Sequence, residues 1–135
     1  MGDVRQKTNI GMHNLQELKI WHKAVDLAVE VYHLTSDFPI EEKYGLTSQI
    51  KRASVSISSN ISEGAGRNSD NEFIHFLGVA NGSAYELQSQ LIISNKLNLV
   101  STGVLDQLLA QPEEIQKMNY ALQNTLKNKK VSSLI

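Results

Sequence analysis

The sequence predicts an all-α protein: an antiparallel up-down-up-down four-helix bundle. Apolar residues recur at spacings of three and four in four successive segments, as on one face of a helix. The chain has only two prolines in 135 residues, and its polar breaks are short. No segment alternates apolar and polar residues as a half-buried strand does. Long helices joined by short turns place sequence neighbours antiparallel, which gives the bundle.

The predicted organisation is one domain with two short appendages. Residues 1–14 are polar and aperiodic and are expected to form a mobile arm, and residues 131–135 a C-terminal tail. The bundle is expected over residues 15–130. Its helices are predicted at about residues 18–37, 41–64, 69–98 and 102–128.

Prolines and glycines mark the ends of the first two helices. The residue before a proline is disfavoured in the α region, so the first helix should stop before Pro39. The second helix should end at Gly64 and Gly66, in the left-handed conformation that glycine permits. Its core stripe is expected to consist of Leu46, Ile50, Ala53, Ile57 and Ile61.

The third and fourth helices carry their own start signals. Ser69 and Glu72 are spaced as a capping box, in which each side chain bonds the other residue's amide. Ser101 or Thr102 is expected to cap the fourth helix. Pro112 interrupts its apolar pattern, so that helix is predicted to be either kinked or broken there.

Composition narrows the classes of function. The chain has 13 basic and 14 acidic residues, a net charge of −1, whereas nucleic-acid binders usually show a basic excess. It has no cysteine, and no apolar run approaches the roughly 18 residues of a membrane span. We therefore expect a cytoplasmic protein without a membrane partner, and the sequence identifies no cofactor and no small-molecule substrate.

Two Glu-x-x-His pairs raise the possibility of a di-metal carboxylate oxidoreductase, because such bundles hold metal with this motif. The pairs are Glu30 with His33 and Glu72 with His75. At about 100° per residue, both pairs fall on the polar side of their helices, so we predict no metal site and no catalytic residues.

Small and polar residues gather on the second and third helices. Five serines between residues 54 and 62 suit a close approach of another helix. The amide of Asn60 is expected to make buried hydrogen bonds, and Glu63 and Arg67 to form an ion pair. Gly82 is expected to mark close packing, either between the second and third helices or against a neighbouring subunit. Val55, on the outer face, indicates a contact between subunits.

Several motifs follow one another in order along the chain: Leu18-Lys-Ile-Trp-His-Lys-Ala24, Tyr32-x-x-Thr35-x-x-Phe38-Pro39, Asn60-Ile61-x-Glu63-Gly64, Gly66-Arg67 and Gly82-Ser83-x-x-Glu86-Leu87. Over residues 15–130 this order resembles the bacterial family of 23S rRNA intervening-sequence proteins. The resemblance implies a four-helix bundle without catalytic residues. A related branch, the accessory protein of diversity-generating retroelements, implies a homopentamer that binds nucleic acid. That branch is strongly basic, and this chain is not.

The leading hypothesis is a non-enzymatic homo-oligomeric module whose further partner is RNA or a nucleic-acid-binding protein. The alternative is a protein–protein adaptor without any role in nucleic-acid binding. The structural residues of the family motifs are Asn60, Glu63, Gly64, Gly66, Gly82 and Ser83. The residues expected to contact a polyanion are Lys51, Arg52, Arg67, Lys127, Lys129 and Lys130.

Overall fold

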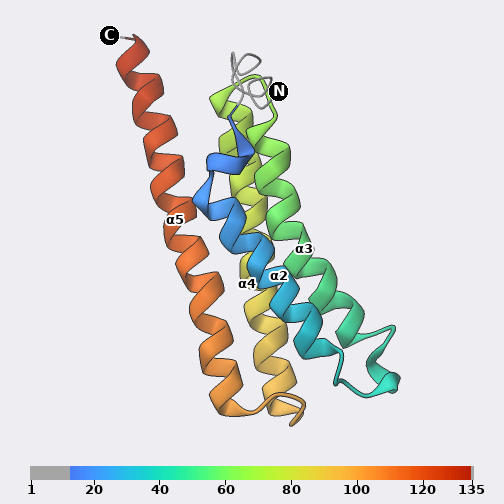
Figure 1. Ribbon diagram of the computed structural model, residues 1–135. Helices are drawn as coiled ribbons and strands as arrows, with labels where there is room; N and C mark the ends of the chain where they lie inside the picture. The colour runs from blue at the N-terminus through green and yellow to red at the C-terminus, as the bar shows by residue number, and fades with distance from the viewer. Residues whose placement is uncertain (1–12, 135) are drawn as a thin grey trace.

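The computed structural model describes residues 13–134 and the side chains of residues 13–129, and it confirms the all-α bundle (Figure 1). Four long helices run up and down, each antiparallel to its neighbour in sequence. The elements in chain order are η1 (Leu15–Glu17), α2 (Lys19–Thr35), η2 (Ile40–Glu42), α3 (Leu46–Ala65), α4 (Asp70–Lys96) and α5 (Thr102–Leu134).

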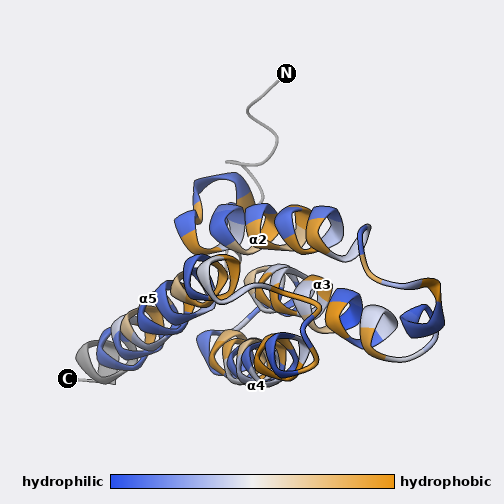
Figure 2. Cartoon of the chain, turned by 90° about the horizontal axis from the view of Figure 1, so that it is seen from below, coloured by the Kyte–Doolittle hydropathy of each residue, from blue (hydrophilic) through white to orange (hydrophobic). Residues whose placement is uncertain are grey.

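The core is formed by one apolar stripe from each helix, which Figure 2 shows facing inward. Phe73 is the largest fully buried side chain. Leu46, the first residue of the stripe predicted for α3, is partly exposed, whereas the other four residues of that stripe are buried. Buried members from the four helices include Leu27, Val31, Ile57, Ile61, Leu77, Leu87, Leu91, Leu108, Ile115 and Leu126.

The predicted arm and tail differ from what the structure describes. Residues 1–12 and 135 lie outside the described residues, so those parts of the prediction stay untested. His13 is fixed to the bundle, because its backbone N–H donates to the Ala65 carbonyl at 3.0 Å. The Asn14 side chain caps η1 by accepting from the Gln16 amide. The tail is absent as a separate segment, since α5 continues to Leu134.

Two helix ends also differ from expectation. The second predicted helix begins at Leu46 rather than near residue 41, because Gly45 separates it from the short turn η2. Gly66 ends α3 with φ −85°, so the left-handed ending predicted there is wrong. The left-handed residue is Asn98, with φ 63°, after α4. Leu99 there donates to the Ser94 carbonyl at 2.9 Å, as in a Schellman motif.

Helix α5 is unbroken across Pro112, which excludes the split helix of the two alternatives. A proline inside a helix cannot donate to the carbonyl four residues earlier, which here belongs to Leu108. The Pro112 ring is buried in the bundle. Burial of apolar surface therefore offsets part of the cost of the missing hydrogen bond.

Candidate assembly face and polyanion surface

The structure places the predicted polyanion-binding residues at opposite ends of the bundle. Lys51 and Arg52 lie in the first two turns of α3, whereas Arg67 follows the far end of that helix. At about 1.5 Å per residue, Arg52 and Arg67 lie roughly 20 Å apart along its axis. Lys127 and Lys129 lie with Arg67 at the end where α5 finishes (Figure 1). The Lys130 side chain lies outside the described residues, so the six do not form one patch.

At the upper end of Figure 1, Arg67 is held by neighbours within the chain. Its guanidinium lies 2.8 Å from the Glu63 carboxylate and 3.8 Å from that of Glu72, so the predicted ion pair with Glu63 is confirmed. The same group lies over the Phe76 ring, 4.8 Å from its centre. Arg67 therefore ties the end of α3 to the first turns of α4.

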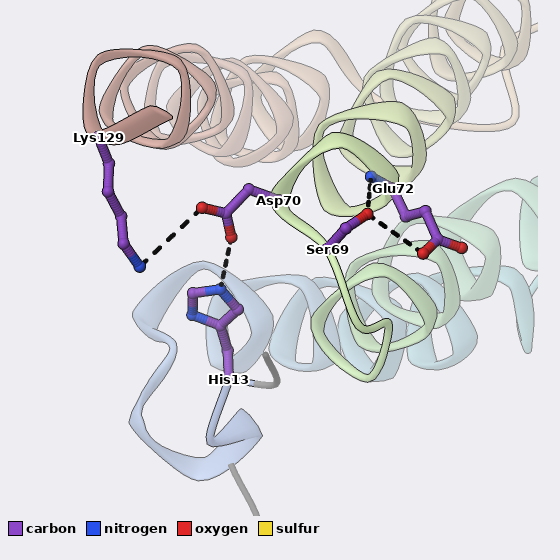
Figure 3. Close-up of polar contacts among 5 residues, drawn as sticks. All are labelled: His13, Ser69, Asp70, Glu72 and Lys129. Carbon is purple, nitrogen blue, oxygen red and sulfur yellow. Dashed lines mark hydrogen bonds and ion pairs between the residues drawn. The ribbon is translucent and has the colours of Figure 1, made fainter. Parts of the chain in front are cut away.

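Asp70 joins three segments at the same end (Figure 3). Its two carboxylate oxygens lie 3.5 Å from His13 Nε2 and 3.9 Å from Lys129 Nζ. The His13 ring also packs at 4.8 Å on that of Phe73. One carboxylate thus contacts the segment before η1 and the end of α5, and it competes with any external anion for Lys129.

The Ser69 cap beside this cluster is half of a capping box (Figure 3). The Ser69 hydroxyl accepts from the Glu72 amide at 3.2 Å, as predicted. The Glu72 carboxylate instead accepts from that hydroxyl, also at 3.2 Å, rather than from the Ser69 amide. The prediction of the helix start is confirmed, and the reciprocal bond is wrong.

The lower end of the bundle in Figure 1, where α2 ends and α3 begins, carries cations beside exposed tyrosines. Lys51 Nζ lies 4.8 Å from the centre of the Tyr32 ring, and Lys43 Nζ lies 5.4 Å from that of Tyr44. Tyr44 is 89% exposed. None of the described carboxylates lies within ion-pair distance of Lys43, Lys51 or Arg52. Sequence reasoning missed Lys43, although the exposed Lys-Tyr pair just before a glycine was a usable signal.

The small residues of α3 and α4 do bring these helices together, although not at the predicted glycine. Ser56 Oγ and Ser83 Oγ lie 2.8 Å apart across the interface. The half-buried Asn60 amide donates to the Ser56 carbonyl at 2.8 Å and to its hydroxyl at 3.0 Å, so the predicted hydrogen bonds are present but are only partly buried. Gly64 is the close approach, since an added Cβ there would lie 2.8 Å from the Phe76 Cβ. A Cβ on Gly82 would meet nothing within 4 Å, so Gly82 does not mark close packing of α4 on α3, and its packing against a neighbouring subunit stays a prediction.

The outward side of α4 is unusually poor in charge. We define the α4 outer face as Gly78, Gly82, Tyr85, Ser89 and Ile92, all of them exposed. A Cβ on Gly78, like one on Gly82, would meet nothing within 4 Å. Between residues 76 and 95 the single charged side chain is Glu86.

A shallow groove of about 470 Å³ runs beside this face, between α4 and α5. Two exposed tyrosines line it, Tyr85 on α4 and Tyr120 on α5, exposed by 60% and 70%. Asn81, Glu113, Gln116 and Lys117 supply the rest of its lining. Sequence reasoning missed both tyrosines, because it followed the buried stripe of each helix.

The two Glu-x-x-His pairs point outward, as predicted. Glu30, His33, Glu72 and His75 are all exposed. Glu30 accepts a hydrogen bond from the Gln111 side chain of α5. Within residues 13–129, no three histidine, aspartate or glutamate side chains gather in a way that could hold a metal ion. The helices described here also lack any segment of the length and hydropathy needed to cross a membrane.

These features define a four-helix-bundle protein whose distinctive surfaces are an uncharged helix face and a tyrosine-flanked cluster of cations. The chain belongs to the family of 23S rRNA-intervening sequence proteins, whose family model matches residues 16–121. No curated protein matches the sequence.

A solved structure supports the same fold. The chain is similar to a protein of unknown function from the S23 ribosomal protein family of Bacteroides thetaiotaomicron. The TM-score is 0.72 at 24% sequence identity, over 77% of this chain and 97% of the other. At that identity the likeness bears on the fold alone.

Proposed function

We propose that this protein is a non-enzymatic, cytoplasmic module that assembles with copies of itself through the α4 outer face. The observation that carries the proposal is the uncharged outward side of α4. Surfaces that are covered in an assembly are depleted in charged residues, as this side of the helix is. A second copy would supply that cover.

The chemistry of the face suits a neighbouring helix. The Cα atoms of Gly78 and Gly82 leave room for another backbone to approach closely. Tyr85, Ile92 and Tyr120 add large contact areas, and aromatic residues are enriched in interfaces from which charged residues are depleted.

Other exposed apolar side chains lie on α2 and α3, where Val29 is 52% and Val55 39% exposed. Contact between two unlike surfaces of identical subunits closes into a ring when the rotation permits. The proposed oligomer is such a ring, a pentamer by the family resemblance.

The test is the mass of the protein in solution at micromolar concentration. We expect the wild-type chain to be an oligomer, and Gly82→Arg and Tyr85→Arg to shift it to monomer without loss of helical content. Gln107→Arg is the matched control, because Gln107 is exposed on the α2 side of α5. A wild-type monomer, or variants that assemble normally, would contradict the proposal.

Binding of RNA is a second candidate function, favoured by Lys43, Lys51 and Arg52 beside exposed tyrosines at the lower end. Phosphate contacts release counterions, so affinity should fall steeply as salt rises. We expect Lys43→Gln with Lys51→Gln to flatten that dependence, and Lys19→Gln with Lys23→Gln on α2 to leave it unchanged. Absence of binding at low salt would exclude this candidate and leave a protein–protein adaptor.

A further inference from the structure

A polar pocket of about 270 Å³ lies between α3 and α4 at the lower end of the bundle. Arg52 on α3 and Glu86 on α4 both line it, yet they form no ion pair with each other. Opposite charges that share a pocket without meeting leave space for a ligand with an acceptor edge and a donor edge. The remaining lining residues are Tyr44, Ser48, Gln49 and Gln90.

Gln90 belongs to the wall of the pocket. It is only 7% exposed, and its Oε1 is buried without a hydrogen-bond partner. Because that oxygen has almost no accessible surface, a ligand in the pocket meets the exposed charged groups of Arg52 and Glu86 instead.

The start of α3 lies beside the pocket. Ser48 and Gln49 lie in the first turn of α3, whose N-cap is Gly45. Glycine offers no side chain to cap the first amides, and no acidic residue lies in that turn. The Glu42 carboxylate lies beside this N-cap, since a Cβ on Gly45 would be 3.8 Å from its Oε1. Lys43 is therefore the group beside the pocket that can attract a phosphate.

We propose that this pocket binds an unpaired guanine base of a single-stranded nucleic acid. Guanine presents two adjacent acceptors, O6 and N7, which match the paired N–H groups of Arg52. Its N1–H and amino group donate along the adjacent Watson–Crick edge, where the two oxygens of the Glu86 carboxylate can accept them. The Tyr44 ring supplies a stacking surface, as in other single-strand sites.

Other ligands use less of the pocket. Adenine offers N7 beside a donor amino group, so it cannot accept both N–H groups of a guanidinium. A free amino acid would satisfy Arg52 and Glu86 by charge but would leave the Tyr44 ring unused. The assignment rests on the RNA-binding candidate and adds a base preference to it.

The experiment uses the full chain and labelled UUUGUUU, UUUAUUU, UUUCUUU and UUUUUUU RNAs, with binding followed by fluorescence anisotropy. We expect the guanine-containing RNA to bind about tenfold more tightly than the others, the discrimination typical of one good bidentate pair. Free amino acids at millimolar concentration should not compete. Equal affinity for the four RNAs, or competition by amino acids, would overturn the assignment.

Matched variants separate the pocket from general RNA binding. Arg52→Lys keeps the charge but loses the planar fork, and Glu86→Gln replaces one acceptor with a donor. Both variants should bind the four RNAs with about equal affinity, so that the guanine preference is lost. Glu113→Gln, with the same charge change on α5, should preserve that preference. Salt-sensitive binding without base preference would overturn the pocket and leave the RNA candidate standing, whereas no binding would end both.

Discussion

A Cβ placed on Gly64 would lie 2.8 Å from the Cβ of Phe76, so the end of α3 packs directly on the first turns of α4. The Phe73 carbonyl, at 3.2 Å, belongs to a helix and cannot move aside easily. We therefore expect Gly64→Ala to destabilise the protein by about 1–3 kcal/mol, as overpacking does. Urea denaturation at fixed protein concentration measures this, because an oligomer's stability depends on concentration.

The matched control for that substitution is Gly103→Ala in the first turn of α5. A Cβ there meets nothing within 4 Å. Alanine should be neutral or stabilise the protein by up to about 1 kcal/mol, since glycine loses more backbone entropy on folding. Equal effects at the two glycines would contradict the close packing at Gly64.

Ser56 is the centre of the polar contact between α3 and α4, because it meets both Ser83 and Asn60. Ser56→Ala should cost about 1–2 kcal/mol, since it leaves two half-buried partners with one bond fewer each. Ser83→Ala should cost less. The double variant should cost less than the sum of the two, which a double-mutant cycle in urea detects.

Ser58 provides the comparison for this site. Its hydroxyl donates only to the Val55 carbonyl of its own helix, at 3.0 Å. Ser58→Ala should leave the unfolding free energy within about 0.5 kcal/mol of wild type. Strict additivity of the Ser56 and Ser83 variants would rule out the contact between their hydroxyls.

Asn119 is a buried polar residue of α5 that is only 1% exposed. Its amide donates to the Leu77 carbonyl of α4 at 2.9 Å, and its oxygen accepts from the Gln123 side chain at 2.6 Å. Asn119→Ala should cost about 1–3 kcal/mol, as when buried partners lose a hydrogen bond. The exposed Asn128 on the same helix is the control, and Asn128→Ala should change the urea midpoint little.

Asp70 lies within 4 Å of both His13 and Lys129 at the upper end and pairs with the Lys129 ammonium group. If RNA is bound there, Asp70→Asn should raise its affinity at low salt by severalfold and steepen the salt dependence, because Lys129 becomes available to phosphate. Asp106→Asn, an equal charge change at the start of α5, should do neither. A salt series with structured RNA distinguishes the two variants.

The fold followed from the sequence because burial of apolar stripes decides a bundle, and the spacing of residues such as Ile57 and Ile61 reports those stripes directly. The caps Ser69 and Ser101 could also be predicted, because capping depends on near neighbours in sequence. The Ser101 hydroxyl accepts from the Val104 amide at 3.3 Å.

Contacts between distant segments were not accessible in this way. Gly64 and Gly82 are both glycines within helices, and the sequence does not distinguish them. Only the position of the neighbouring helix decides which of the two is crowded. The candidate pocket requires Arg52 and Glu86 to face the same space from two helices, which depends on the relative rotation of α3 and α4. The meeting of Asp70 with Lys129 likewise needs the full length of α5.

The seam between α2 and α5 differs from the other three because it joins the helices farthest apart in sequence. Lys23 lies 2.7 Å from Glu114 across it, and Glu30 meets Gln111, around a polar cleft of about 210 Å³. Every other seam closes between helices joined by a short turn. Because solvated polar contacts resist local opening least, amide hydrogens beside this cleft should exchange with deuterium before those of α3 and α4. The α2–α5 interface is therefore the place where we expect the bundle to open locally.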